Sequence, residues 1–166
     1  IIFITLLMLS QSALAEWVLD QRSSVINFIT TKNASKTEVQ TFNNFDGSIN
    51  SKRAVLSVDL NSVDTGIAIR DTRLRELFFD ITDFPVARVR LNVNKAKLDK
   101  LKQGQRKVLQ LDAVIDLHGL QKTMPVKIQI VAFAKGKVLV TAKEPIMVDL
   151  KDFNLLAGSE ALRAIA

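Results

Sequence analysis

Apolar and polar residues alternate with a period of two along most of the chain after residue 15. In the clearest segment, Val89, Leu91 and Val93 alternate with arginine and asparagine residues. This alternation is typical of a β-strand that buries one face and exposes the other. The same pattern predicts further strands over residues 56–60, 109–117, 126–130, 138–143 and 146–153. The chain is therefore predicted to form an all-β domain.

Short connections join the predicted strands. His118-Gly119 and Lys135-Gly136-Lys137 each separate two alternating segments, which predicts antiparallel hairpins in an up-and-down order. About eight strands in about 150 residues form either a sandwich or a closed barrel. The alternation itself fits both architectures. The short connections favour the barrel, because Greek-key sandwiches need longer crossing connections.

Two segments depart from the strand pattern. Leu74, Leu77 and Phe78 have helical spacing behind Asp71, which predicts a short helix over residues 71–79 with Asp71 as its N-terminal cap. Residues 159–166 are rich in helix formers and predict a second short helix.

The first fifteen residues have a pattern of their own. Residues 1–9 are almost entirely apolar, and Ala13-Leu14-Ala15 precedes Glu16. This predicts a secretory signal peptide over residues 1–15, since such a run is shorter than the ~20 helical residues that cross a bilayer. We expect the mature protein to begin at Glu16 as one domain over residues 16–166, and the sequence to be clipped ahead of Ile1.

Composition narrows the functional classes. The chain has no cysteine, which excludes disulfides, thiolate metal sites and a cysteine nucleophile. The net charge is +6, and the densest positive stretch, residues 95–107, is interpreted as a solvated turn, with weak contact to an anionic membrane surface as the alternative. Nucleic-acid binding is not expected, because the aromatic residues are not interleaved with this basic stretch.

Two motifs suggest polar chemistry. Asp64-Thr65-Gly66 matches half of the aspartic-protease signature, but the sequence has no second copy, so a turn with Gly66 at positive φ is favoured. His118 is the only histidine and is interpreted as a hydrogen-bonded turn residue. The sequence predicts no catalytic residue, metal site or cofactor.

A series of short motifs, in order along the chain, resembles the YceI-like family of periplasmic, lipocalin-like, polyisoprenoid-binding proteins. The matching residues are Trp17-Val18-Leu19-Asp20, Ser24-Val25-Ile26-Asn27-Phe28, Phe42-Asn43-Asn44-Phe45-Asp46-Gly47, Asp64-Thr65-Gly66, Arg70-Asp71-Thr72-Arg73-Leu74-Arg75, Phe78-Phe79-Asp80-Ile81, Phe84-Pro85, Asp116-Leu117-His118-Gly119 and Asp152-Phe153-Asn154-Leu155. Each motif is weak alone, and their order and spacing make the match specific.

The resemblance implies an antiparallel barrel with one or two short helices around a long apolar tunnel. Family members usually continue beyond a helix like residues 160–165 into a final strand. Here we expect that closing strand to be absent and the barrel to be open or C-terminally truncated. The inward apolar residues expected to contact the ligand are Ile26, Phe28, Phe42, Phe45, Leu77, Phe78, Leu91, Ile115, Ile128 and Phe153.

The function that the resemblance implies is binding, without catalysis, of an isoprenoid lipid or quinone in the periplasm, by a monomer or homodimer. Arg70 and Asp71 are expected to form an ion pair and a helix cap, and Arg70 is also a candidate contact for the ligand head group. Two alternatives remain open. One is an enzyme acting on a lipid or quinone head group, and the other is a stress-related interaction module whose barrel is filled by side chains.

Overall fold

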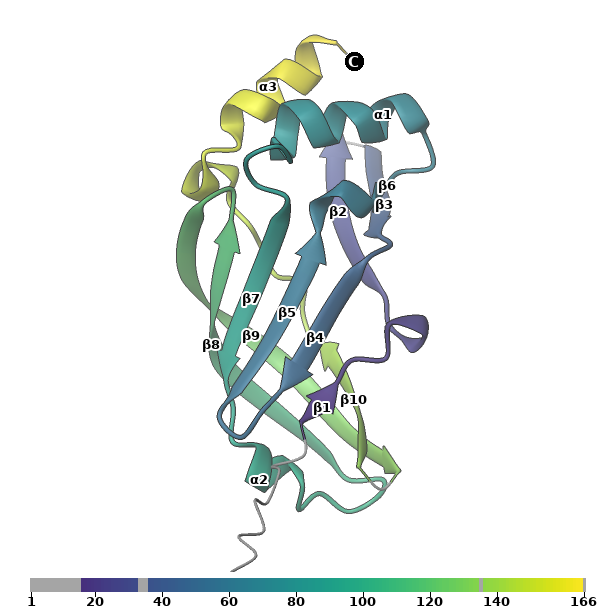
Figure 1. Ribbon diagram of the computed structural model, residues 1–166, viewed down its shortest axis with the longest axis vertical. Helices are drawn as coiled ribbons and strands as arrows, with labels where there is room; N and C mark the ends of the chain where they lie inside the picture. The colour runs from purple at the N-terminus through teal and green to yellow at the C-terminus, as the bar shows by residue number, and fades with distance from the viewer. Residues whose placement is uncertain (1–15, 33–35, 135, 166) are drawn as a thin grey trace, which may run out of the picture.

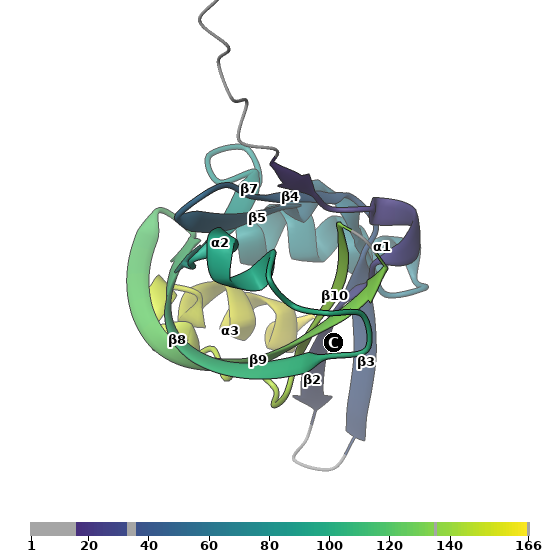
Figure 2. The same cartoon turned by 90° about the horizontal axis from the view of Figure 1, so that it is seen from below.

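The computed structural model describes residues 16–32, 36–134 and 136–165, so the predicted signal peptide lies outside the described residues. The described chain forms a seven-stranded antiparallel sheet that curls around its own concave face (Figure 1). A three-stranded antiparallel sheet lies beside it. Seen from below, the large sheet forms a curved wall around the interior, and α2 (Lys95–Leu98) lies across the lower end (Figure 2). The prediction of a mostly β, barrel-like domain is confirmed.

The large sheet has the strand order β1-β4-β5-β7-β8-β9-β10. Its strands are β1 (Trp17–Val18), β4 (Phe45–Ile49), β5 (Arg53–Asp59), β7 (Val86–Asn92), β8 (Arg106–Leu117), β9 (Leu120–Ala134) and β10 (Lys137–Ala142). The small sheet has the order β2-β3-β6. Its strands are β2 (Ile26–Lys32), β3 (Lys36–Phe42) and β6 (Val63–Asp64).

Helices cover the two ends of the curled sheet. At the upper end lie α1 (Ala68–Arg73), the wider π-helical turn η3 (Leu74–Phe79) that continues it, and α3 (Leu156–Ala164) (Figure 1). The described residues also form three short 3₁₀ helices, η1 (Gln21–Ser23), η2 (Leu60–Ser62) and η4 (Leu150–Phe153).

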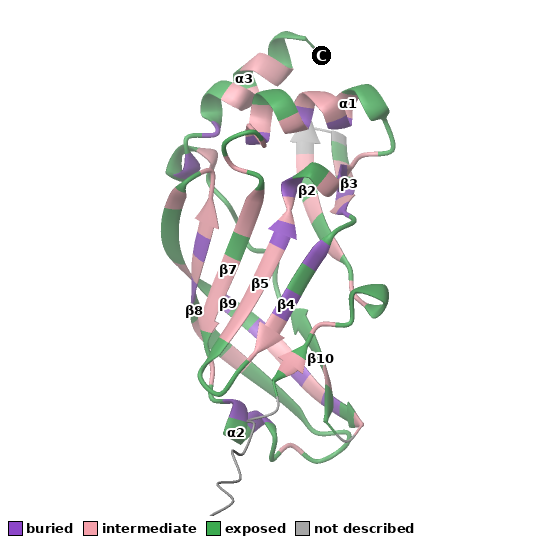
Figure 3. Ribbon diagram, in the orientation of Figure 1, coloured by how far each residue is buried: buried purple, intermediate pink, exposed green. Residues whose placement is uncertain are grey.

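The observed register places the alternating apolar residues on one face. Leu56 on β5 pairs with Val89 on β7, which pairs with Ile115 on β8. Because neighbouring partners in a sheet point to the same side, these side chains form one apolar row on the concave face. The first three residues of β4 are buried, exposed and buried in turn (Figure 3). The period of two read from the sequence thus corresponds to an inner and an outer face.

The barrel is open on one side. β1 and β10 are the two edges of the large sheet, and no ladder between described strands joins either of them to the small sheet. β2 and β3 lie at the upper part of this side, and β10 lies lower (Figure 1). The apolar concave face is therefore a trough with an open side, as the open-barrel expectation anticipated.

The predicted hairpin at His118-Gly119 is confirmed. Leu117 pairs with Leu120, and the two residues between them have positive φ angles of 51° and 73°. A two-residue turn of this type needs positive φ at both central positions, which matches the twist of the flanking strands. Gly119 also has no room for a side chain, since an added Cβ would lie 2.7 Å from the Phe84 ring.

The helix predicted over residues 71–79 forms, but it begins earlier and Asp71 does not cap it. Ile67 holds the N-cap position without a side-chain hydrogen bond. Asp71 is buried, and its Oδ1 accepts hydrogen bonds from the Thr65 amide (2.9 Å) and hydroxyl (2.6 Å). The carboxylate therefore fastens the preceding turn to the helix, a contact that spacing within the helix does not reveal.

The strand predicted over residues 146–153 is wrong. Residues 143–149 are irregular, and Leu150–Phe153 form η4. Asp149 caps η4 by accepting a hydrogen bond from the Lys151 amide (3.0 Å), and the apolar residues before it gain no buried face, since Met147 is 84% exposed. Alternation over a few residues is therefore insufficient to specify a strand without a partner to pair with.

The basic stretch after residue 94 is only partly the solvated turn that was expected. Lys95 is buried. Its ammonium group lies 2.8 Å from Asp99 and 4.6 Å from the centre of the Trp17 ring. This contact joins α2 to β1 across the lower end of the barrel, and cation–π attraction of this kind strengthens when it is partly desolvated.

Candidate functional site

The concave face of the large sheet is the candidate site, and its apolar side chains gather in two clusters. The first cluster contains Leu98, Ala113, Ile115, Val126, Ile128, Ile130, Phe153 and Leu155. The second contains Phe42, Phe45, Val58, Leu60, Val63, Leu74 and Phe79. Phe78, from the helical turn above the trough, is packed against both. The two clusters therefore meet beneath the helices that cover the upper end.

The structure brings nine of the ten predicted ligand residues into or against these clusters. The first cluster includes or contacts Leu91, Ile115, Ile128 and Phe153. The second cluster includes or contacts Ile26, Phe28, Phe42 and Phe45. Phe78 contacts both clusters. Leu77 is the exception, because it belongs to neither cluster and is 43% exposed on η3.

The nine residues differ in whether a ligand can reach them. Phe153 is completely buried, and Phe45 and Ile115 are nearly so, which makes them packing residues of the core. Phe28 and Leu91 are only partly buried although they face inward. An inward apolar side chain that protein atoms leave partly uncovered is suited to contact an apolar ligand. The accessible part of the predicted set is thus Ile26, Phe28, Phe78 and Leu91.

One accessible inward residue was not among the predicted ligand contacts. Val140 on β10 pairs with Ile130, which is buried on the concave face, so Val140 points the same way. It is 44% exposed because β10 is the edge of the sheet. The alternating pattern of residues 138–143 could have indicated that Val140 faces inward. Its exposure could not be predicted in this way, because it depends on β10 being the edge strand.

Phe133 shows the reverse case. Although it is apolar, it follows the inward Ala132 on β9 and is 55% exposed. The outer face of β9 is apolar at Val131 as well. Alternation there does not distinguish inside from outside, and Phe133 faces away from the trough.

Arg70 forms the expected ion pair, but with Glu38 instead of Asp71. Its Nη1 donates to Glu38 Oε2 at 2.8 Å, joining α1 to β3, and both side chains are partly buried. Nearby on the inward face of the small sheet, Gln40 is buried and the Thr30 hydroxyl is buried without a hydrogen-bond partner. Contact between Arg70 and a ligand head group stays a prediction.

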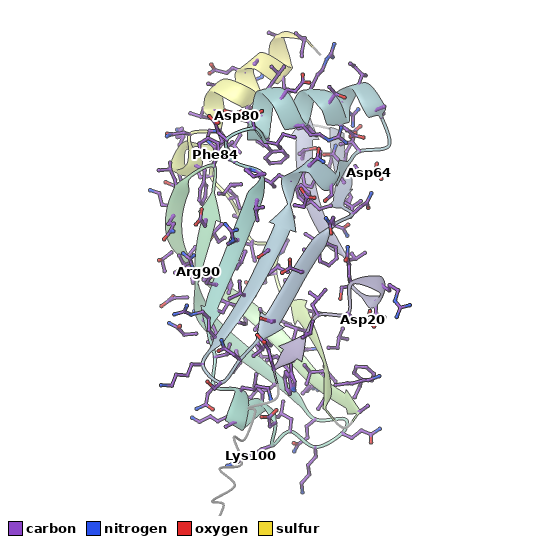
Figure 4. All side chains as sticks on the ribbon, in the orientation of Figure 1. Asp20, Asp64, Asp80, Phe84, Arg90 and Lys100 are labelled. Atoms are coloured by element: carbon purple, nitrogen blue, oxygen red, sulfur yellow. The ribbon has the colours of Figure 1, made fainter. Side chains whose placement is uncertain are left out.

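The Asp64-Thr65-Gly66 motif forms a turn, as expected. Asp64 lies near α1 (Figure 4) and accepts hydrogen bonds from the Gly66 amide (2.8 Å) and the Asn43 side chain (3.0 Å). These bonds lower the pKa of Asp64 from its ordinary value of 3.8, with the Gly66 amide as the main cause. A protease dyad needs one carboxylate whose pKa is raised by its neighbour, so this geometry favours the turn.

His118 is a hydrogen-bonded turn residue, as predicted. Its Nδ1 lies 3.1 Å from the Phe153 carbonyl oxygen, and its ring lies against Phe84 with centroids 4.3 Å apart. Nδ1 must carry a proton to donate to this carbonyl. The contact holds the β8–β9 turn against η4.

Two further properties bear on the class of site. Within residues 16–32, 36–134 and 136–165, no three His, Cys, Asp or Glu side chains are grouped so that they could hold a metal ion. In the same part of the chain, no helix has the length and apolar character needed to cross a membrane.

Comparison with known proteins identifies the family. The model of the YceI-like domain matches residues 17–165. The solved structure of a polyisoprenoid-binding domain from Saccharophagus degradans, implicated in plant cell wall breakdown, is 31% identical to the chain with a TM-score of 0.88. The match covers 92% of this chain and 87% of that one. A search of curated proteins finds no match.

A more distant solved structure shares the fold. A mutant of the CJ YceI protein, made for nanotechnology applications, is 16% identical with a TM-score of 0.58, and the match covers 86% of this chain and 84% of that one. Because the family model spans nearly all of the described residues, the chain belongs to the YceI-like domain family.

Proposed function

We propose that the protein binds an isoprenoid chain along its concave apolar face and shields it from water. The observation that carries this proposal is the trough itself, where inward residues such as Phe28, Leu91 and Val140 remain partly uncovered. The Saccharophagus degradans relative is a polyisoprenoid-binding domain, which supports the same ligand class. An isoprenoid tail offers almost nothing to hydrogen-bond, so a lining made mostly of apolar side chains suits it.

The binding energy in this proposal is hydrophobic. Each CH₂ group removed from water contributes about 0.8 kcal/mol, so a tail of several isoprene units binds without a specific polar contact. For the same reason selectivity among tails of similar length is expected to be low, because an apolar surface distinguishes one methylene more or less only weakly. No step of the proposal requires catalysis.

Variants of the inner face test the proposal. Phe28→Ala, Phe78→Ala and Leu91→Ala each remove inward apolar surface, so each should lower the amount of isoprenoid recovered per mole of folded protein. Organic extraction followed by mass spectrometry measures that amount, and circular dichroism establishes the folded fraction.

Two outward variants serve as controls. Phe133→Ala makes the same substitution at an exposed phenylalanine, and Arg90→Ala changes an outward residue on the same strand as Leu91 (Figure 4). Both should leave lipid recovery unchanged. Undiminished recovery in all three inward variants would show that the trough does not hold the lipid.

We further propose that the protein works in the periplasm, supported by the signal-peptide pattern of residues 1–15. N-terminal sequencing of the protein from the periplasmic fraction should find Glu16 as the first residue. An intact segment from Ile1 to Ala15 on that protein would contradict the proposal.

A further inference from the structure

The wall of the half-barrel has a lateral gap between β7 and β8. The two strands pair only from Arg88 opposite Asp116 to Leu91 opposite Ala113. Below this point β8 continues to Arg106 with β9 as its partner. Residues 106–112 of β8 thus have no ladder partner on the β7 side among the described strands.

The gap exists because the chain after β7 is held away from β8. The Val93 amide donates a hydrogen bond to the Lys52 carbonyl (2.9 Å), which keeps the chain beside the β4–β5 turn. Asn94 then accepts a hydrogen bond from the Lys97 amide (3.1 Å) and caps α2. An Asn cap of this kind fixes the start of a helix, so α2 forms where a longer β7 would otherwise pair with β8.

A hollow of about 380 Å³ occupies this gap. It is lined by Asn92, Val93, Asn94, Lys97, Leu98, Lys107, Leu109 and Leu111. Leu98 belongs to the first apolar cluster, and Leu109 and Leu111 are packed against that cluster. The volume lies within the range of about 300–1,000 Å³ that small-molecule sites occupy. The hollow therefore opens at the surface and has side chains of the first apolar cluster and its neighbours in its lining.

The rim of the hollow is cationic. Lys97 and Lys107 are both exposed, and neither has an ion-pair partner in the described part of the chain. No carboxylate is among the residues that line the hollow. Lys95, by contrast, is bound to Asp99. Two unpaired ammonium groups above an apolar floor complement an amphiphile whose head group is anionic.

We infer that this gap receives the head group of an isoprenoid phosphate. The phosphate lies between Lys97 and Lys107, and the first part of the tail lies against Leu109 and Leu111. Lysine binds phosphate as a point charge with up to three donors, and the exposed position leaves the head group in contact with water. The inference rests on the proposed function and deepens it, because it specifies the charge of the ligand and where its head group leaves the barrel.

Equilibrium dialysis with two probes of equal tail length tests the inference. Farnesyl phosphate carries the anion and farnesol does not. The wild-type protein should bind farnesyl phosphate at least about tenfold more tightly, since charge-assisted contacts of two lysines are lost with farnesol. The double variant Lys97→Gln/Lys107→Gln should bind the two probes equally.

The control is Lys100→Gln/Lys102→Gln, which makes the same change in net charge within the same basic stretch (Lys100 is labelled in Figure 4) but outside the hollow. It should keep the preference for farnesyl phosphate. Inorganic phosphate at the concentration of the probe should not displace farnesyl phosphate, and displacement would reveal a site for free phosphate instead.

The remaining outcomes separate the inference from the proposed function. Equal binding of both probes by the wild type, or an equal loss in both double variants, would overturn the inference and leave tail binding intact. Binding of neither probe would overturn both.

Discussion

Replacing Phe153 by alanine is expected to lower the free energy of unfolding by about 3–5 kcal/mol. Phe153 has no exposed surface and lies in the first apolar cluster with Ile128 and Leu155. Its removal leaves a cavity that the surrounding strands fill only partly, so the loss adds a cavity cost to the transfer free energy. Urea denaturation followed by circular dichroism measures the change.

Phe133→Ala is the matched control for this effect. The same atoms are removed from a side chain that is 55% exposed, and surface substitutions usually change stability by about 0.5 kcal/mol or less. A similar loss in both variants would mean that Phe153 is not the core residue that its burial indicates.

Replacing Gly158 by alanine is expected to destabilise the protein, although alanine is the better helix former. A Cβ at this position would lie 2.5 Å from the Leu77 carbonyl oxygen and 2.9 Å from the Phe78 Cα. Both atoms belong to the backbone of η3, so α3 must move away. Overpacking of this kind costs about 1–3 kcal/mol, which outweighs the gain of about 0.5–1 kcal/mol from helix propensity.

The sign of the stability change in Gly158→Ala distinguishes close packing of α3 on η3 from a simple effect of helix propensity. Ala157→Gly, at the neighbouring exposed position, should lower stability only by the propensity difference of about 1 kcal/mol or less. If Gly158→Ala raised the urea midpoint, α3 would not be seated on η3 as closely as the distances indicate. Lipid recovery from the folded fraction would additionally show whether the packing of α3 against Phe78 matters for binding.

The strands could be predicted because their alternation reflects a physical asymmetry between two faces. Val89 and Leu91 alternate with charged residues and lie inward as expected. The same reasoning failed over residues 146–153, where none of the described strands pairs with the segment. Local alternation reports which residues share a side, whereas pairing depends on distant parts of the chain.

The sequence predicted most of the residues that line the candidate site, but not which of them a ligand can reach. Phe28 and Phe153 are the same residue type and both lie inward, yet Phe28 is only partly buried whereas Phe153 is completely buried. That difference depends on which elements cover each side chain. The burial of Lys95 by Trp17 and Asp99 is a similar case, because a lysine in a basic stretch ordinarily stays in water.

The lateral gap depends on tertiary register in the same way. The alternating segments of β7 and β8 predict two strands, but where their ladder ends is determined by the bonds that hold Val93 and Asn94 beside other elements. The cationic rim then follows from the positions of Lys97 and Lys107 at that gap. From the sequence alone these lysines are indistinguishable from their neighbours in the basic stretch.

The most direct test of the central claim is organic extraction of the full chain purified from a bacterial periplasm, with mass spectrometry of the extract. Lipid binding in the trough predicts a series of isoprenoid molecules, in an amount comparable to that of the protein and depleted in the Phe28→Ala protein but not in Phe133→Ala. An extract without isoprenoids, or one whose lipid composition matches the host membrane in all three proteins, would contradict it.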